Sequence, residues 1–339
     1  MKSKRLITIT ALLMLVICIV TGCSGNLTDE DASGEYPLTV VDQAGREVTI
    51  DNEPESIVSP YYISTSLVMA LGLGERLVGV EDNAQLRPIY QLSNPDILEL
   101  QNVGSVKELD IEAVAALEPD LVILPMKLKS AVEPLEELGI TVIIINPESQ
   151  ELLEESIVLV ATATAVKERG DELLGFINEK KEFLTEKLKD TESVSVYMGG
   201  NSDFLSTASN GMYQNELIEL AGGKNVAGEI EDTYWVMTSY EQLLKWNPSY
   251  IITASSAGYS VKDVLNNSSV AICSAVKSRN VYHMPDNVES IDSPVPGGIL
   301  GAMWMANVLH PDVVSKDDYE KAVKDFYKQF YDVEVTFKK

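Results

Sequence analysis

The strongest constraint in this chain is a short pattern that occurs twice. Residues 109–124 read LDIEAVAALEPDLVIL and residues 238–253 read TSYEQLLKWNPSYIIT; the prolines of the two copies, like their glutamates Glu112 and Glu241, lie 129 positions apart. In each copy, apolar residues at helical spacing end at the proline, and a run of apolar residues follows. Each copy therefore predicts a short helix followed by a buried strand, and the repetition indicates two related halves.

The same alternation of strand and helix extends along both halves. Mostly apolar, strand-like runs occupy residues 56–60, 77–81, 121–125 and 142–146 in the first half, and 193–198, 250–255 and 280–285 in the second. Segments with helical spacing lie between these runs. Such alternation implies a largely parallel sheet that helices cover on both faces. Each half is therefore predicted to be an α/β layer structure.

A stretch without proline separates the two halves. Residues 150–190 predict two successive helices, and the second, over residues 168–190, carries its apolar side chains on one face. A long one-sided helix at this point is suited to be a rigid connector. The predicted fold class is α/β: two Rossmann-like lobes, at residues 37–167 and 191–339, joined by a single long linker helix, with a ligand cleft between them.

The N-terminus has the pattern of an export signal. A basic start precedes an apolar run over residues 6–20, and Val20-Thr21-Gly22-Cys23 resembles the bacterial lipobox. A transmembrane helix is the alternative, but the run is short and ends at small residues instead of a positive cluster. We therefore expect cleavage of a signal peptide at residues 1–22 and lipidation of Cys23. The polar, acidic residues 23–36 are predicted to be a disordered tether, which makes the protein extracytoplasmic and anchored to the cell membrane.

Composition excludes several classes of function. The chain has 26 basic and 52 acidic residues, a net charge of −26, and loss of the signal peptide removes three basic residues to leave −29. Nucleic acid is therefore not an expected partner, because phosphate binding needs a clustered cationic face. Of three cysteines only Cys273 stays free once Cys18 is cleaved off and Cys23 is lipidated. With His283 and His310 far apart in sequence, neither a metal site nor a cofactor is predicted.

Five ordered motifs resemble one family. VVDQAGREVTI, ALGLGERLVGV, DIEAVAALEPDLVI, LIELAGGKNVA and SYEQLLKWNPSYII are similar to the signatures of class III, helical-backbone substrate-binding proteins of ABC transporters, which carry iron-siderophores, haem and cobalamin. The resemblance runs from about Leu38 to about Pro311. It implies a ligand held between two lobes that undergo little hinge motion. It also implies that Glu112 and Glu241 dock onto arginines of a dimeric permease; the alternative is that each is only a favourable first-turn residue of its helix.

Candidate ligand contacts in the first lobe follow the predicted strands, because ligands of doubly wound sheets meet the loops at the carboxyl ends of strands. Tyr61 and Tyr62 stand where the family more often has a Ser-Pro-Ser sequence, and they are suited to stack on a flat ligand or to donate hydroxyl groups. Packing within the lobe is the alternative role. Arg87 is a candidate partner for a carboxylate, phosphate or oxyanion, because its guanidinium pairs bidentately with anions. Lys127 and Lys129 are more simply explained as solvated side chains.

The second lobe offers two further groups of candidates. Tyr234 and Trp235 are predicted to lie in a loop that contacts the ligand in relatives, with core packing as the alternative. Three polar residues precede a helix predicted to start near Pro296, whose free amide groups are suited to hold an anion: Ser290, Asp292 and Ser293.

The sequence therefore predicts a binding protein and not an enzyme. It is expected to capture an iron-siderophore, haem or corrinoid and to deliver it to the permease of an ABC importer. The expected partner is the permease dimer with its ATPase. Within the family, the alternative ligand is a small oxyanion such as molybdate or tungstate. A secreted enzyme is disfavoured because no nucleophile elbow, phosphate loop or zincin motif occurs, and an adhesion lipoprotein because low-complexity arms are lacking.

Overall fold

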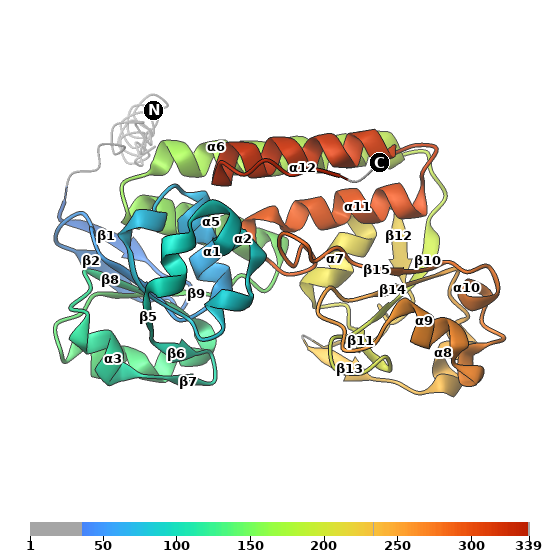
Figure 1. Cartoon of the computed structure of the whole chain (residues 1–339), viewed down its shortest axis with the longest axis horizontal. Coiled ribbons are helices and arrows are strands. Elements are labelled where there is room, and N and C mark those ends of the chain that lie inside the picture. Colours follow the sequence, from blue (N-terminus) through green and yellow to red (C-terminus); the bar gives the residue numbers. More distant parts are fainter. Residues whose placement is uncertain (1–35, 233, 338–339) are drawn as a thin grey trace, which may run out of the picture. The chain divides into compact units, whose positions relative to one another are not determined.

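The computed structural model describes residues 36–232 and 234–337. The predicted signal peptide, the predicted lipidation at Cys23 and all but the last residue of the predicted tether therefore lie outside the described residues. Within the described ranges, the order of strands and helices follows the predicted alternation (Figure 1).

The N-terminal lobe is built on a five-stranded parallel sheet with the order β5-β4-β3-β8-β9. Two small antiparallel hairpins, β1-β2 and β6-β7, accompany it. The strands are β1 (Leu38–Val41), β2 (Glu47–Ile50), β3 (Ile57–Ser59), β4 (Leu77–Val80), β5 (Gln101–Asn102), β6 (Gly104–Ser105), β7 (Glu108–Leu109), β8 (Leu121–Pro125) and β9 (Val142–Ile145). The helices are α1 (Tyr62–Ala70), α2 (Pro88–Ser93), α3 (Ile111–Ala116), α4 (Val132–Glu136) and α5 (Gln150–Ala163).

The C-terminal lobe has a second sheet, with the order β13-β11-β10-β14-β15 and with β12 paired to β10. Its β12, β10, β14 and β15 are parallel, whereas β11 and β13 are antiparallel additions. The strands are β10 (Val194–Gly199), β11 (Ser206–Ala208), β12 (Gly223–Asn225), β13 (Trp235–Met237), β14 (Tyr250–Thr253) and β15 (Val281–His283). The helices are α7 (Tyr213–Leu220), α8 (Tyr240–Trp246), α9 (Val261–Asn266), α10 (Ser274–Lys277) and α11 (Ile299–Leu309).

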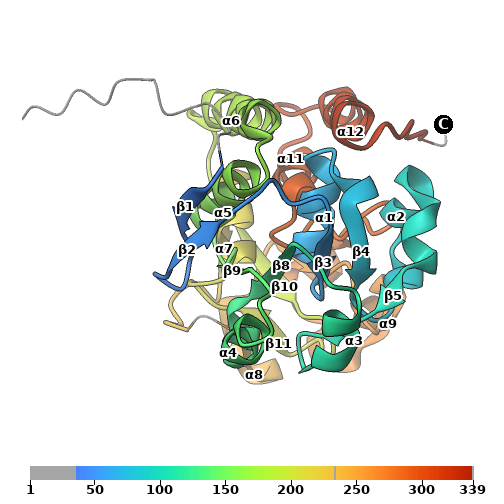
Figure 2. The same cartoon turned by 90° about the vertical axis from the view of Figure 1, so that its left-hand side faces the viewer.

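Two long helices span both lobes along one side of the molecule (Figures 1 and 2). Helix α6 (Lys167–Leu188) connects the two sheets in sequence and packs against α5 of the first lobe and α11 of the second. Helix α12 (Lys316–Tyr331) follows α11, packs on it, and returns to α1 of the first lobe. The Arg169 guanidinium of α6 also donates a hydrogen bond to the Gln329 carbonyl of α12. The predicted connector thus has a second, C-terminal helix beside it.

The buried core explains why the strand runs are apolar throughout. Along β8, Leu121 and Ile123 face a large core that runs through both lobes beneath α6 and α12, while Val122 and Leu124 face a smaller core under α3 and α4. The second sheet also has a small core, on the face turned away from the large core, where Tyr197 packs under α8 and α9. Because the lobes share the large core and keep separate small cores, we expect them to be stiffly joined on the α6 side.

The repeated pattern is visible in the backbone. Glu112 occupies the second position of α3, and Glu241 occupies the second position of α8. The side chain two residues before each glutamate, Asp110 or Ser239, caps the N-terminus of that helix. Glu118 and Asn247, again 129 positions apart, both adopt left-handed φ angles of 47° immediately before the proline. Strands β8 and β14 then take equivalent central places in their sheets. The two copies are therefore the same structural unit.

Candidate ligand-binding site

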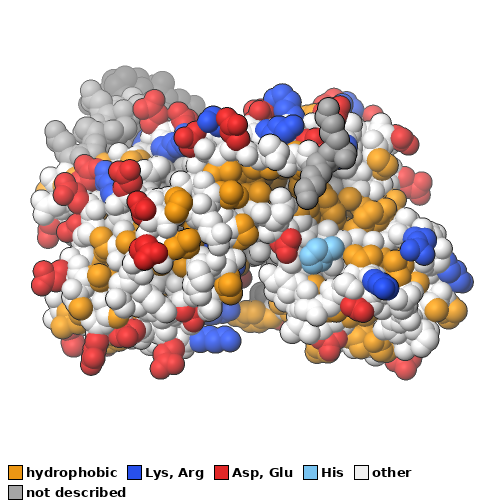
Figure 3. Space-filling view, viewed as in Figure 1, with side chains coloured by type: hydrophobic (Ala, Val, Ile, Leu, Met, Phe, Trp, Pro, Cys, Tyr) orange, Lys and Arg blue, Asp and Glu red, His pale blue; other side chains and the backbone are white. Residues whose placement is uncertain are grey.

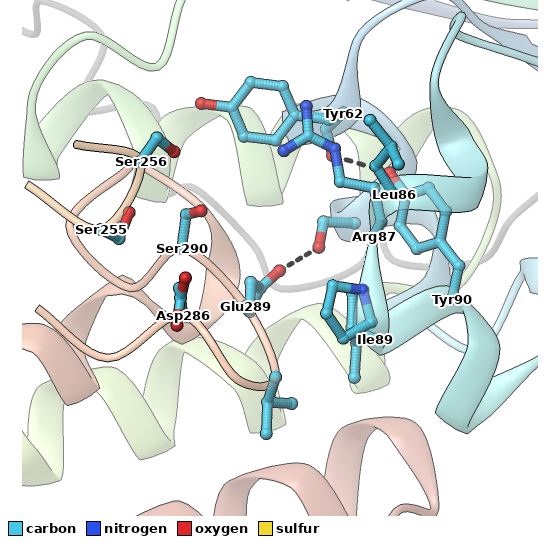
Figure 4. A pocket seen from close by; sticks show the side chains of 13 residues that line it. Tyr62, Leu86, Arg87, Ile89, Tyr90, Ser255, Ser256, Asp286, Glu289 and Ser290 are labelled. Carbon is cyan, nitrogen blue, oxygen red and sulfur yellow. Dashed lines mark hydrogen bonds between the residues drawn. The ribbon is translucent and has the colours of Figure 1, made fainter. Parts of the chain in front are cut away.

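A cavity of about 230 Å³ lies between the lobes at the carboxyl ends of their strands. The N-terminal lobe lines it with residues after β3 and β4, and the C-terminal lobe with residues after β14 and β15. The lining includes Tyr62, Ser66, Arg87, Tyr90, Ser255, Ser256, Asp286, Glu289 and Ser290 (Figure 4). Carboxyl ends of parallel strands are where ligands of such sheets bind, so this cavity is the candidate site.

Arg87 supplies the cationic group of the cavity. Pro88 begins α2 and holds Arg87 in an extended conformation (φ −96°, ψ 105°), as expected for a residue before proline. The guanidinium lies over the Tyr62 ring, 4.2 Å from its centroid. Its Nε atom is buried and has no hydrogen-bond partner in the described part of the chain, and no ion pair among those residues includes it. A buried cationic donor without a partner is a costly arrangement that an anionic ligand would relieve.

A buried carboxylate stands behind this arginine. Glu81 is 5% exposed and accepts hydrogen bonds from Thr65 Oγ1 at 2.7 Å and from Tyr90 Oη at 2.8 Å. Burial raises the pKa of Glu81, while these hydrogen bonds and the charge of Arg87 act to lower it. These hydrogen bonds hold Tyr90 at the cavity wall. Glu81 forms no ion pair with the Arg87 guanidinium.

The C-terminal lobe presents hydroxyl and carboxyl groups to the same cavity. Ser290 and Ser256 line it directly. Ser255 also lines it, and both its backbone amide and its hydroxyl donate to the Asp292 carboxylate. Burial raises the pKa of Asp292, whereas the hydrogen bonds from Ser255 act to lower it. Asp292 therefore does not line the cavity itself but positions Ser255, which does.

The two lobes touch each other beside the cavity. The Tyr62 hydroxyl donates to Ser293 Oγ at 3.1 Å, across 231 residues of sequence. At the deeper end, the Ser66 hydroxyl of α1 donates to the Glu289 carboxylate. Both contacts join a residue of the N-terminal lobe to the loop after β15, so Tyr62, Ser66 and Glu289 both line the cavity and join the lobes.

Tyr61, Tyr234 and Trp235, the other aromatic residues predicted to contact the ligand, are not among the residues that line the cavity. Tyr61 packs edge-on against Tyr62, with ring centroids 5.3 Å apart, and burial raises its pKa. Tyr234 is 61% exposed, and Lys127 Nζ of the opposite lobe lies 5.9 Å from its ring centroid. Trp235 was predicted to be in a loop, and this is wrong: it begins strand β13, pairs with Ala208 of β11, and packs partly buried against the large core.

Sequence reasoning thus brought together three cavity-lining residues, Tyr62, Arg87 and Ser290, and missed several others. Glu289 immediately precedes the predicted Ser290. Ser255 is the last residue of the strand predicted at residues 250–255 and Ser256 follows it, so a position at a strand end was the available signal for these two serines. Among the described residues no group of three or more His, Cys, Asp or Glu side chains is arranged to hold a metal ion.

The candidate docking residues lie away from the cavity. Glu112 and Glu241 are both exposed, and their helices α3 and α8 lie on the side of the molecule opposite α6 and α12, one on each lobe (Figures 1 and 2). The pKa of Glu241 is lowered by hydrogen bonds from its own backbone amide and from Ser239. Acidic side chains are otherwise spread over both lobes (Figure 3). Within the described ranges no helix combines the length and apolarity needed to cross a membrane.

This two-lobed fold with a cleft at the strand ends is that of a periplasmic substrate-binding protein. The chain belongs to that family: the family model described as periplasmic binding protein matches residues 57–288. The resemblance inferred from the five motifs is therefore confirmed.

Several relatives are similar over three quarters or more of their length. The molybdate-binding protein MolA of Haemophilus influenzae is 27% identical, over 94% of this chain and 95% of that protein. The ABC transporter substrate-binding lipoprotein YvrC of Bacillus subtilis is 27% identical, over 91% and 98% respectively. A cobalamin-binding protein of Halobacterium salinarum is 24% identical, over 83% and 76%. The solved structure of MolA bound to molybdate matches 88% of this chain and 99% of that chain, at 25% identity with a TM-score of 0.78.

Proposed function

We propose that the protein is the lipid-anchored, extracytoplasmic substrate-binding component of an ABC importer, and that its ligand is a small oxyanion of the molybdate class. The first part agrees with family membership and with relatives that serve transport. The second part reverses the order of ligands that the sequence favoured. The observation that carries it is the buried, unpartnered Nε of Arg87 in a small cavity between the lobes.

The size of the cavity supports a small ligand. Pockets for drug-sized molecules usually enclose roughly 300–1,000 Å³, and this cavity encloses about 230 Å³. A tetrahedral oxyanion fits that space, whereas haem or a corrinoid would require the lobes to separate. Separation would break the contacts of Tyr62 with Ser293 and of Ser66 with Glu289.

The chemistry of the lining supports an anion with several oxygen atoms. Arg87 offers a planar fork of donors, which matches oxyanion geometry. Ser256 and Ser290, on the opposite wall, offer hydroxyl groups that donate to oxygen as readily as they accept. A charged donor on one lobe and neutral donors on the other would hold the anion across the cleft.

A metal chelate is the second candidate, and three side chains outside the cavity favour it. Tyr61, Tyr234 and Lys127 present aromatic faces and a cation outside the small cavity, which suits a flat or anionic chelate. The similarity to a cobalamin-binding protein agrees with this candidate. The iron-siderophore, haem or corrinoid ligand predicted from the sequence therefore requires a more open cleft.

Delivery to the importer would use the outer rim. In our proposal Glu112 and Glu241 dock onto cationic side chains of the two permease subunits, because two equivalent carboxylates on related lobes match a two-fold partner. Cys23 would hold the protein at the membrane by its lipid. Turnover forms no part of this function, since capture and release suffice.

A ligand screen by thermal unfolding tests the assignment. Ligand binding to the folded state stabilises it by RT ln(1 + [L]/Kd), which is about 4 kcal/mol at a thousandfold excess over Kd. We expect molybdate and tungstate to raise the Tm, and haem, cobalamin and ferric siderophores to leave it unchanged. Stabilisation by a chelate without stabilisation by any oxyanion would overturn the small-oxyanion assignment and leave the transport assignment standing.

A further inference from the structure

Glu289 is a buried carboxyl group that faces the ligand cavity and the lobe contact together. It is 7% exposed and lines the same cavity as Arg87. Figure 4 shows its side chain directed from the C-terminal lobe toward α1, where the Ser66 hydroxyl donates to it. Capture of an anion by Arg87 and the serines of the opposite wall does not involve this group.

The groups around Glu289 come from five elements, and Arg87 is the only cation among them. One of these groups is Tyr213 of α7, whose pKa the charge of Glu289 acts to raise. Ser66 of α1 donates to one carboxylate oxygen, and Tyr327 of α12 donates to the other at 3.4 Å. Tyr331 of α12 donates to the Ser66 carbonyl at 3.0 Å, and a Cβ at Gly297, before α11, would lie 2.7 Å from the carboxylate. Arg87, before α2, acts on it through space. Among the described residues no ion pair includes Glu289.

This environment favours the neutral form of the carboxyl group. Burial raises the pKa of Glu289 to about 7, although the hydrogen bonds from Ser66 and Tyr327 and the charge of Arg87 act to lower it. At neutral pH the free protein is therefore a mixture of protonated and ionised molecules.

An anion in the cavity would change that balance. The cavity has one cationic group, Arg87, and a second carboxyl group, that of the exposed Asp286. An oxyanion beside Arg87 places further negative charge in a space that also contains the buried Glu289. Like charges in such a space repel strongly, and the weaker acid takes up a proton. A protonated carboxyl group also gains an O–H donor, whereas an ionised one can only accept.

We propose that Glu289 is a specificity-determining residue that takes up a proton when an oxyanion enters the cavity, so that capture near neutral pH consumes one proton. The inference rests on the proposed oxyanion function. Protonation of Glu289 would make the site selective for negatively charged ligands. Binding of an oxyanion is favoured at low pH, whereas binding of a neutral ligand would gain nothing from the protonation.

Calorimetric titration of the purified protein with molybdate between pH 6.5 and pH 8.5 tests the proposal. The bound state holds a proton that the free state loses above about pH 7, so affinity is full below that pH and falls as pH rises through it. We expect Kd to rise roughly 25-fold across this range. Titrations at pH 8.5 in buffers with different heats of ionisation should show uptake of about one proton per bound anion.

Matched variants separate Glu289 from other carboxylates. Glu289→Gln should bind molybdate at pH 8.5 nearly as tightly as the unmodified protein does at pH 6.5, and its Kd should not depend on pH. Glu99→Gln, the same change at an exposed position, should keep the original pH profile. Because proton uptake is measured on the unmodified protein, a variant that fails to fold does not remove the test.

Two results would overturn the inference. A Kd for molybdate that stays constant from pH 6.5 to pH 8.5, without proton uptake, would contradict it and leave the oxyanion assignment intact. Absence of oxyanion binding at every pH, with binding of a metal chelate, would overturn both together.

Discussion

The two lobes are most alike at their outer rim and least alike where they line the cavity between them. On the rim, α3 and α8 each place a glutamate at the second helical position, and a left-handed residue stands before the proline that follows each helix. In the cleft, the N-terminal lobe contributes Arg87 stacked on Tyr62, whereas the C-terminal lobe contributes serines and carboxyl groups.

In the proposed function, this difference follows from what each surface would bind. A partner with two-fold symmetry needs equivalent groups on the two lobes, so the rim keeps the repeat. A small anion held between the lobes has no such need, and one strong cationic donor opposed by neutral donors is sufficient. The duplicated framework is therefore used symmetrically on one side and asymmetrically on the other.

The largest expected effect concerns the symmetric surface. A double charge reversal, Glu112→Arg with Glu241→Arg, should abolish ligand uptake by cells while the purified variant binds its ligand normally, because both carboxylates lie on exposed rims away from the cavity. Each single reversal should reduce uptake. Uptake that survives in the double variant would contradict docking through Glu112 and Glu241. Glu99→Arg, at another exposed position, is a control with the same charge change as each single reversal.

The next effect concerns the asymmetric surface. Arg87→Ala should weaken oxyanion binding by at least roughly 30-fold, because loss of a buried charged partner costs about 2–5 kcal/mol. Arg87→Lys should recover only part of this, since lysine lacks the planar fork. Titration calorimetry measures both. Arg76→Ala, which removes an arginine paired with Glu53 at the surface, should bind like the unmodified protein; equal losses in the two alanine variants would point to a general effect on folding.

A smaller effect concerns the buried carboxyl group between the lobes. The folded-state pKa of Glu289 is raised from 4.5 to about 7, so the folded protein holds this proton more tightly than the unfolded chain does. Stability therefore falls as pH rises from about 4.5 through 7. Relative to the unmodified protein, Glu289→Gln should gain about 2.5 kcal/mol in free energy of unfolding between pH 5 and pH 8. Denaturant titrations at the two pH values check this, and a pH-independent difference would contradict it.

The smallest effect concerns the single hydrogen bond at the cavity edge that links Tyr62 to Ser293. A double-mutant cycle with Tyr62→Phe and Ser293→Ala should give a coupling energy of about 1 kcal/mol in unfolding free energy. The cycle cancels the separate effects of each change. Strictly additive effects would mean that the lobes are not held together by this pair.

The sequence predicted the framework well because its signals are local and repeated. The apolar run at residues 121–125 is strand β8, and the one-sided segment predicted over residues 168–190 is helix α6 at Lys167–Leu188. Buried strands and amphipathic helices bear periodic patterns of their own. By contrast, β5, β6 and β7 have two residues each, too few for any pattern to be detected.

The site was predictable only in part, because its chemistry depends on long-range contacts. Arg87 could be selected for its residue type and its place after a strand. Glu289 is one of 52 acidic residues, and nothing near it in sequence distinguishes it; its importance comes from Ser66, 223 positions away, and from Tyr327 of α12. Trp235 was misplaced because a short antiparallel strand at a sheet edge has no strong alternation.

The most direct test of the account is a crystal structure of the protein grown with molybdate, recorded at the molybdenum absorption edge. The account predicts one anomalous peak between the lobes, within hydrogen-bonding distance of the Arg87 guanidinium and facing the serines of the opposite wall. An empty cleft, or a peak only on the outer surface of one lobe, would contradict the claim that this cavity captures an oxyanion.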